Sequence, residues 1–293
     1  MPLVLAHRGA NKASPQNTLP AFQKALDFNA DGLETDVHLS MDGHIVICHN
    51  YTIDETSNGT GRVDEMTLSQ LKSFDFGSYF SDEFKGVTLP TLPELLDLTK
   101  SMKLINIEIK PPQKDCDLVK KVVEAIHEYD IIENSIVSCF DPECIRLVKE
   151  IDKNVKTGLL YEDDQLGHEI MTFGVAKYCK QLNADAAHPH RKLITHKEVI
   201  DLHNLGIKVN PWTVDLPELI DNMITLKTPM DESARLARQE AREKTGLSDE
   251  DIGVFFITPC PAKMTSIKAS AAVEISAVSG ARKSDAKGSS VEF

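Results

Sequence analysis

The chain is poor in cysteine, and its cysteines are not spaced as a metal or redox motif. Six cysteines occur among 293 residues, at positions 48, 116, 139, 144, 179 and 260, and no two of them form a C-x-x-C pair. This spacing argues against zinc-binding and dithiol redox motifs. Cys48, Cys139 and Cys179 lie in apolar runs, so we expect them to be small core residues.

Long apolar runs and an excess of positive charge are also missing. No run of about 18 apolar residues occurs, and the first ten residues, MPLVLAHRGA, lack the basic and apolar regions of an export signal. The net charge of −13 argues against a nucleic-acid backbone or an anionic membrane as the main partner. A local cation site or basic pocket could still hold a phosphorylated small molecule. We expect a cytoplasmic protein with no membrane span and no nucleic-acid partner, and the oligomeric state stays open.

Short runs rich in β-branched residues alternate along the chain with amphipathic stretches. The predicted strands are 3–9, 32–40, 44–50, 103–110, 135–140, 156–162, 184–189 and 207–214. The predicted helices are 18–29, 92–100, 117–129, 141–151 and 195–206. Asp141 and Thr195 have the position of helix N-caps, and Gly206 has that of a helix stop. Such alternation over about 200 residues is typical of a parallel α/β fold.

One predicted hairpin contains two acidic residues and several histidines among apolar ones. Residues 31–50 read DGLETDVHLSMDGHIVICHN, in which Asp42-Gly43 is a turn signal. Side chains two apart on a strand share a face, so Glu34, Asp36 and His38 point the same way. Taken alone, this pattern is more typical of a solvated edge strand, because acidic side chains usually stay in water.

Polar residues at the ends of the other predicted strands favour a functional site instead. They are His7, Arg8, His49, Glu108, Lys110 and Trp212. In a β/α barrel the chemistry takes place at the C-terminal ends of the strands. One barrel would therefore bring all these side chains and the hairpin acids to the same end, which a set of unrelated surface residues would not explain.

Several motifs together resemble the glycerophosphodiester phosphodiesterase family over about residues 3–224. They are HRGA, SPQNTLPAF, the hairpin above, INIEIK and VNPWTV, and they occur in the order and spacing of that family. The resemblance implies a TIM (β/α)8 barrel of the phospholipase-C-like phosphodiesterase kind. It also implies that the polar, Gly-rich stretch 51–90 is a small cap inserted after the hairpin, and its three aromatics in FDFGSYF favour a folded cap over a linker.

The carboxylates and basic residues of these motifs suit phosphodiester chemistry. Oxygen ligands without cysteine favour a hard cation, Ca²⁺ or Mg²⁺, and the resemblance implies Glu34, Asp36 and Glu108 as its ligands. Such a cation would offset charge that develops on the phosphodiester oxygens. Arg8 could bind the phosphate through its planar fork and Lys110 as a point charge.

Cleavage of a phosphodiester needs a base for the nucleophile and an acid for the leaving alkoxide. His7 and His49 fit that pair, and the resemblance assigns the catalytic histidines to these positions. Which one is acid and which base stays open, as does the nucleophile, either water or the glycerol hydroxyl of the substrate. Trp212 could pack on the glycerol side of the pocket with the cap residues Phe76 and Tyr79, or it could belong to the core.

The remaining histidines and two departures from the family pattern leave alternatives open. His38 belongs to no motif of the family and would be a supporting or a surface residue, while His188 and His190 could line the pocket or lie in a turn. Gln16 stands where the family usually has Glu, so a charge is lost while three carboxylates remain for the metal. Asn50 stands where the family usually has Asp, which could change how His49 is oriented.

The C-terminal part of the chain does not resemble the phosphodiesterases. Residues 1–227 would form the barrel, and 228–278 resemble a fragment of the iron-only hydrogenase large-subunit family. Iron–sulfur ligation needs several cysteines together. No other cysteine lies near Cys260 in the sequence, so we do not expect hydrogenase activity. The apolar run 252–260 could supply an eighth strand and close the barrel, and the polar tail 279–293 has a disordered composition.

The sequence predicts a metal-dependent hydrolase that cleaves a small-molecule glycerophosphodiester to glycerol 3-phosphate and an alcohol. One alternative is a related barrel phosphodiesterase that acts on a phospholipid, although no membrane-binding segment is evident. The other is a remnant that binds metal or phosphate without turnover. The head-group alcohol depends on the shape of the pocket at the cap and cannot be read from these motifs.

Overall fold

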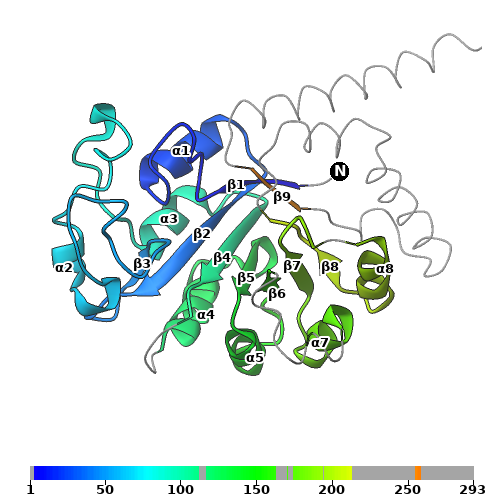
Figure 1. The fold of residues 1–293 in the computed structure, drawn as a ribbon. Coiled ribbons are helices and arrows are strands. Elements are labelled where there is room, and N and C mark those ends of the chain that lie inside the picture. Colours follow the sequence, from blue (N-terminus) through cyan, green and yellow to red (C-terminus); the bar gives the residue numbers. More distant parts are fainter. Residues whose placement is uncertain are drawn as a thin grey trace, which may run out of the picture.

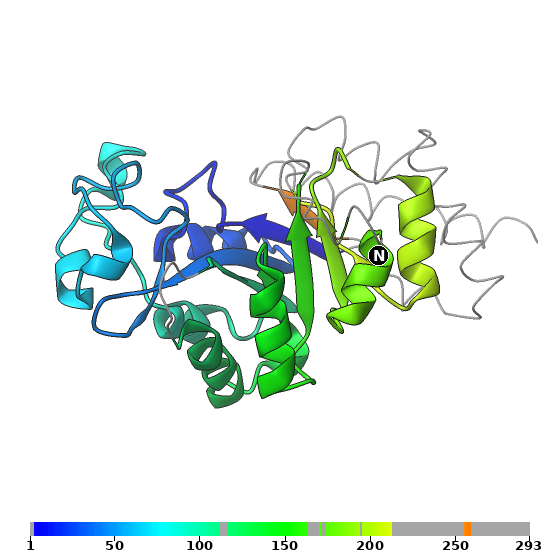
Figure 2. The same cartoon turned by 60° about the horizontal axis from the view of Figure 1, so that its bottom comes forward.

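The computed structural model describes residues 3–111, 117–162, 170, 174–193, 195–212 and 255–258. These residues form a curved sheet with helices packed on its outer face (Figure 1). The small cap lies at the end of the molecule farthest from α7 and α8 (Figure 2). The segment 228–246, the tail 279–293, Cys116 and Cys260 lie outside the described residues.

The sheet consists of parallel strands with one antiparallel hairpin strand. The parallel strands are β1 (Leu3–His7), β2 (Gly32–Leu39), β4 (Leu104–Ile109), β5 (Ser135–Cys139), β6 (Thr157–Tyr161), β7 (Ala186–Pro189), β8 (Lys208–Val209) and β9 (Phe255–Thr258). Their order in the sheet is β8-β7-β6-β5-β4-β2-β1-β9, and β3 (Ile45–Ile47) pairs antiparallel with β2. The predicted parallel α/β barrel fold is therefore confirmed, with the Asp42-Gly43 turn between β2 and β3.

The described helices outside the cap are α1 (Leu19–Asp27), α3 (Leu92–Thr99), α4 (Leu118–Glu128), α5 (Pro142–Ile151), α7 (Val175–Gln181) and α8 (His196–Asn204). Three of them, α3, α5 and α8, begin at a residue whose side chain accepts from a free N–H group of the first turn. Asp141 accepts from the N–H of Glu143, and Thr195 accepts from the N–H of Glu198, as their N-cap positions predict. None of the helices in the described part of the chain has the length and apolar character needed to cross a bilayer.

Two apolar layers hold the barrel together. The larger one lies between the sheet and the helices and contains the apolar faces of α1, α3, α4 and α5. The smaller one fills the inside of the barrel with Leu5, Leu104, Ile136 and Ala186. Leu5 lies two positions before His7 and Leu104 four positions before Glu108, so these residues share the inward face of their strands with the candidate site and form an apolar floor beneath it.

The cap consists of short helical turns around a small core of its own. Its helical turns are η1 (Val63–Glu65), α2 (Leu68–Leu71) and η2 (Asp82–Phe84). The buried residues of this core are Val46, Cys48, Ile53, Val63, Leu71, Phe76 and Leu89. Because Phe76 is part of this core, it does not line a pocket with Trp212.

The strand β9 lies beside β1, in the position of an eighth barrel strand. It pairs in parallel from Leu3↔Phe255 to Ala6↔Thr258, within the stretch 252–260 suggested by the sequence. Within the described ranges no ladder joins β9 to β8. The division of the chain at residue 227 and the closure of the barrel by the C-terminal segment stay predictions.

Removal of β9 should leave β1 with an unpaired edge. We expect a chain that ends at residue 254 to aggregate, because an exposed strand edge pairs with other chains. The measurement is light scattering with size-exclusion chromatography. A chain that ends at residue 278 is the control, since it keeps β9 and loses only the tail; equal behaviour of the two would show that β9 does not protect this edge.

Candidate active site

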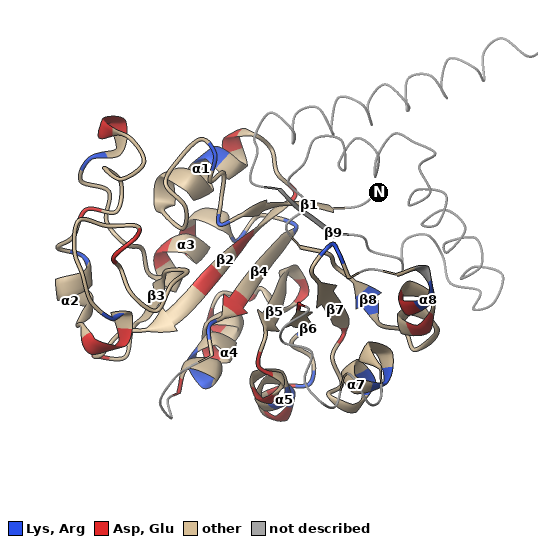
Figure 3. Cartoon of the chain, viewed as in Figure 1, with Lys and Arg blue, Asp and Glu red and all other residues tan. Residues whose placement is uncertain are grey.

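Three carboxylates meet inside the barrel where β2 and β4 run side by side. The register pairs Asp36 with Glu108 and places Glu34 opposite Asn106, so alternate residues of both strands point inward. The exposed fractions of Glu34, Asp36 and Glu108 are 2%, 1% and 8%, and one oxygen of each lies within 4.8 Å of the others. Figure 3 shows acidic segments, in red, on the ribbons of both β2 and β4.

Positive side chains compensate part of this buried negative charge. The Nζ of Lys110 lies 2.8 Å from Asp36 Oδ1 and also donates to Glu108. Burial opposes the charged form of Lys110, but the two carboxylates outweigh it and raise the pKa of the ammonium. Burial likewise opposes ionisation of Asp36, yet the charges of Lys110 and Arg8 together lower the pKa of this carboxyl.

The other two carboxylates are not compensated to the same degree. Burial, and then the negative charge of Asp36, raise the pKa of Glu34 well above its usual value. Burial also raises the pKa of Glu108. A buried acid with a raised pKa is stabilised in its charged form by an additional cation.

The oxygen donors fit a hard divalent cation. Glu34 Oε1 is buried and has no hydrogen-bond partner among the described residues, so it has a lone pair free for a ligand. Three carboxylates in one cluster are the donor set that Ca²⁺ and Mg²⁺ prefer. The residues that the sequence singled out as ligands are thus brought together, and they could hold such an ion.

The turn after β1 brings Arg8 to the carboxylates through an unusual backbone. Arg8 has φ of +54° and Gly9 has φ of +74°, a region that costs a non-glycine residue roughly 1–3 kcal/mol. In return, the N–H of Arg8 donates to Glu34 Oε2 at 3.0 Å. A Cβ at Gly9 would lie 2.8 Å from the Cβ of Ala21 in α1, so only glycine allows α1 to pack this closely.

Residues of the SPQNT motif hold this site from the side of α1. Arg8 Nη1 donates to Gln16 Oε1 at 2.7 Å, and Arg8 Nε lies 3.5 Å from Asp36 Oδ2. Asn17 Nδ2 donates to the same carboxylate oxygen of Asp36 at 2.7 Å. Asn17 lies within the SPQNT motif, but its contact with Asp36 was not predicted from the sequence.

The two histidines expected to act as acid and base lie at the edge of the same cluster. His7 Nε2 is 3.8 Å from Glu34 Oε2, and burial together with the charge of Arg8 lowers the pKa of His7 to about 3. Burial also lowers the pKa of His49. Both imidazoles are therefore neutral at neutral pH in this arrangement.

The hydrogen bonds around His49 indicate which ring nitrogen carries its proton. His49 Nδ1 lies 2.5 Å from Asn50 Oδ1, and Asn50 Nδ2 donates to Glu55 Oε2 at 2.8 Å. Since the carboxylate of Glu55 can only accept, it fixes the amide of Asn50 with its oxygen towards His49. The neutral ring then has its proton on Nδ1, which leaves Nε2 as an acceptor.

His38 supports the end of the hairpin. It is buried, its Nε2 lies 3.4 Å from the backbone oxygen of His49, and its ring contacts Tyr51 edge-on with 5.1 Å between the centroids. The alternative of a surface residue is therefore wrong, and the contacts are those of a residue that holds His49 in place.

Trp212 packs near the end of β7, against His190, which directly follows that strand. The ring of Trp212 lies 5.6 Å from Phe140 and 4.9 Å from His190, centroid to centroid, and its Nε1 donates to the backbone oxygen of His188. His188 is buried inside the barrel rather than in a turn, with Nε2 at 2.9 Å from Asn210 Nδ2. A Cβ at Gly158 would lie only 2.2 Å from this ring.

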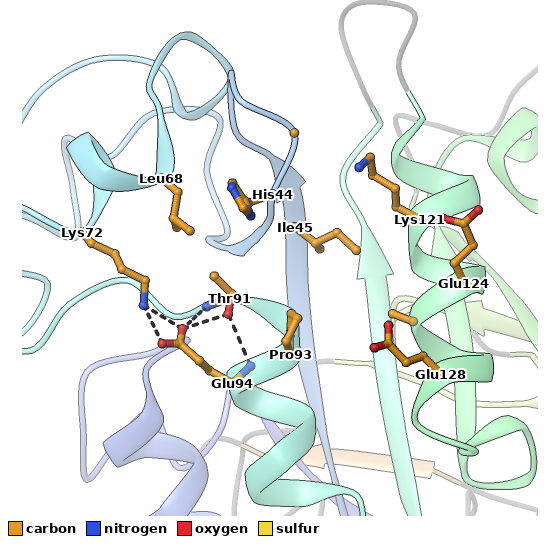
Figure 4. Close-up of a pocket in the computed structure, with 12 residues that line it drawn as sticks. His44, Ile45, Leu68, Lys72, Thr91, Pro93, Glu94, Lys121, Glu124 and Glu128 are labelled. Atoms are coloured by element: carbon orange, nitrogen blue, oxygen red, sulfur yellow. Dashed lines mark hydrogen bonds and ion pairs between the residues drawn. The ribbon is translucent and has the colours of Figure 1, made fainter.

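A separate cleft of about 410 Å³ lies outside the barrel, between the cap, α3 and α4. Figure 4 shows that Lys72 and Glu94 pair on one side of it, while Lys121, Glu124 and Glu128 come from α4 on the other. None of the residues predicted for the active site lines it. The charges around this cleft are mixed and lie on exposed or half-buried side chains, so the better candidate for an active site is the buried carboxylate cluster.

Known proteins match the chain over most of its length. It is 37% identical over 228 residues to a glycerophosphodiester phosphodiesterase of Caldanaerobacter subterraneus subsp. tengcongensis, covering 76% of this chain and 89% of the relative. It is 32% identical over 231 residues to another from Bacillus altitudinis, covering 77% and 91%. The fold is similar to an Oleispira antarctica phosphodiesterase solved with the product sn-glycerol-3-phosphate, with a TM-score of 0.70, 23% identity and coverage of 92% and 97%.

Two family models match the chain and overlap. The iron only hydrogenase large subunit, C-terminal domain, matches only residues 209–278. The glycerophosphoryl diester phosphodiesterase family matches residues 7–242, which include every residue of the candidate site described above. With this match and the relatives above, the chain belongs to the glycerophosphoryl diester phosphodiesterase family.

Proposed function

We propose that the chain hydrolyses glycerophosphodiesters to glycerol 3-phosphate and an alcohol, with the help of a divalent cation. The observation that carries this proposal is the cluster of Glu34, Asp36 and Glu108, buried together next to two cationic and two imidazole side chains. Relatives with 32–37% identity over most of the chain are named for this activity.

Glu34, Asp36 and Glu108 would hold the cation, either Ca²⁺ or Mg²⁺. When bound, the ion supplies positive charge at the phosphate and stabilises charge that develops on its oxygens. The floor of Leu5, Leu104 and Ile136 lies below and keeps water from approaching the cluster from that side.

Arg8 and Lys110 bind and orient the phosphate. Arg8 offers a planar pair of donors, while Lys110 offers a compact charge held at Asp36 and Glu108. Because Lys110 is already held by the carboxylates and Arg8 by Gln16, little side-chain freedom is lost when the substrate binds.

His49 and His7 move the protons. His49 has an acceptor nitrogen, Nε2, and its ring is fixed by Asn50 on one side and supported by His38 behind it, so we assign it the role of base. His7 stands at the other side of Glu34 and delivers a proton to the leaving oxygen, for which it must first be protonated. Trp212 packs along the organic part of the substrate.

Removal of the cation should abolish turnover. We expect EDTA to stop release of glycerol 3-phosphate from glycerophosphocholine and glycerophosphoethanolamine, and added Ca²⁺ or Mg²⁺ to restore it. Glu34→Gln should lower kcat by at least about a hundredfold, because it removes a ligand charge at nearly constant shape. Glu124→Gln, a matched change on the exposed face of α4, is the control. Turnover that persists in EDTA would rule out the role of the metal.

Loss of either histidine should affect the chemical step. We expect His49→Ala and His7→Ala each to lower kcat by roughly 10²–10⁴-fold with a smaller change in KM, measured by the same release assay. His44→Ala, an exposed histidine of the same hairpin, should leave kcat unchanged. A folded wild-type chain that binds metal but releases no product would identify it as a binding remnant instead.

A further inference from the structure

We propose that Gln16 is the positioning residue of Arg8, and that the cap acts on phosphate affinity through it. This inference rests on the proposed function, in which Arg8 binds the substrate phosphate. Gln16 is not expected to touch the reacting atoms. Gln16 holds the guanidinium in place with a neutral amide, so that no negative charge at position 16 offsets the attraction between Arg8 and the substrate phosphate.

The contacts of Arg8 single out Gln16. The bond from Arg8 Nη1 to Gln16 Oε1, at 2.7 Å, is the only side-chain hydrogen bond of Arg8 among the described residues. Arg8 Nε is buried without a hydrogen-bond partner there, 3.5 Å from Asp36. The carboxylate of Asp36 is meanwhile shared with Lys110 at 2.8 Å and Asn17 at 2.7 Å. The orientation of the guanidinium plane therefore depends on Gln16.

The neutrality of Gln16 matters for the charge of the site. Three carboxylates, two cationic side chains and a divalent cation leave one net positive charge, which matches the single negative charge of a phosphodiester. A carboxylate at position 16 would lie against Arg8 in low-dielectric surroundings and cancel this excess. An amide offers the same acceptor oxygen without that charge.

The cap holds Gln16 from the other side. The N–H of Gln16 donates to the hydroxyl of Tyr79 at 3.1 Å, between residues 63 positions apart in the sequence. Tyr79 and Phe80 remain 41% and 38% exposed, although Tyr79 is anchored through this bond.

A row of aromatic rings continues from Tyr79 to α1. Tyr79 contacts Phe80, and Phe80 contacts Phe84, with centroids 6.5 and 5.6 Å apart. Lys24 of α1 lies over the ring of Phe84 at 5.2 Å. The cap therefore contacts both the loop that carries Gln16 and, through Lys24, the last turn of α1. A change in how the cap docks would move the guanidinium without any contact between cap and phosphate.

Three variants of the metal-saturated full chain separate the parts of this inference. Gln16→Leu removes the acceptor at similar size, Gln16→Glu keeps the acceptor and adds a charge, and Tyr79→Phe removes only the hydroxyl and keeps the ring. The readouts are KM and kcat for glycerophosphocholine and the inhibition constant of glycerol 3-phosphate. The dissociation constant of inorganic phosphate, from calorimetry, adds a readout that needs no turnover.

The expected changes appear in binding and depend on ligand charge. Gln16→Leu should raise KM by about tenfold with kcat within about threefold, and Tyr79→Phe should raise KM by about two- to threefold. Gln16→Glu should raise KM by about fivefold and the inhibition constant of the product by about twenty-five-fold, because the product carries nearly twice the charge of the diester and is repelled about twice as strongly. In Gln16→Leu the ratio of KM for the diester to the inhibition constant of the product should equal that of the wild-type chain.

Two results would overturn the inference. One is unchanged KM and phosphate affinity in the Gln16 variants of an active enzyme, and the other is a fall in kcat alone that parallels a lower melting temperature. If the wild-type chain turns over no glycerophosphodiester, the proposed function fails, but the phosphate affinities of the same variants still decide the role of Gln16. A wild-type chain that neither turns over a glycerophosphodiester nor binds phosphate overturns both.

Discussion

The confinement of three carboxylates within one dry part of the barrel is the constraint on which the rest of the structure depends. Glu34, Asp36 and Glu108 have lost nearly all contact with water, and unpaired charges in such a place cost several kcal/mol each. Part of this cost is offset by favourable contacts of the carboxylates with the ammonium of Lys110, the guanidinium of Arg8 and the amide of Asn17. What remains uncompensated is the negative charge that a cation could neutralise.

The elements around the cluster serve this compensation. The two consecutive left-handed residues after β1 turn the N–H of Arg8 onto Glu34. Gly9 allows α1 to approach closely enough for Gln16 to accept from Arg8 and for Asn17 to donate to Asp36. The hairpin fixes His49 through Asn50 and His38. Charge balance, backbone strain and helix packing are thus parts of one arrangement rather than separate features.

Alternation of apolar runs and helical stretches was sufficient to predict a parallel α/β fold, because period and capping are local signals, whereas the barrel was implied by the resemblance to the family. The strand predicted over 32–40 is β2 (Gly32–Leu39), and the one predicted over 103–110 is β4 (Leu104–Ile109). The face shared by Glu34 and Asp36 followed from strand geometry alone, and the structure adds Glu108 through the register between β2 and β4. The predicted core positions of Cys48, Cys139 and Cys179 are confirmed.

Contacts made across long sequence separations could not be predicted in this way. The bond between Gln16 and Tyr79, the buried position of Phe76 in the cap core and the pairing of His188 with Asn210 all depend on how loops fold back. No periodicity encodes such contacts, so the roles assigned to the site residues continue to rest on geometry and family membership.

The pairing of β9 with β1 also has a consequence for how the chain is made. The strand that ends in His7 lies near the first residue, whereas its neighbour lies about 250 residues later. At a translation rate of about 5–20 residues per second, the first strand waits roughly 12–50 s on the ribosome before that neighbour exists. The strand that carries His7 is therefore synthesised long before the strand that covers its edge, and folding of the nascent chain becomes a competition between late β-pairing and premature association.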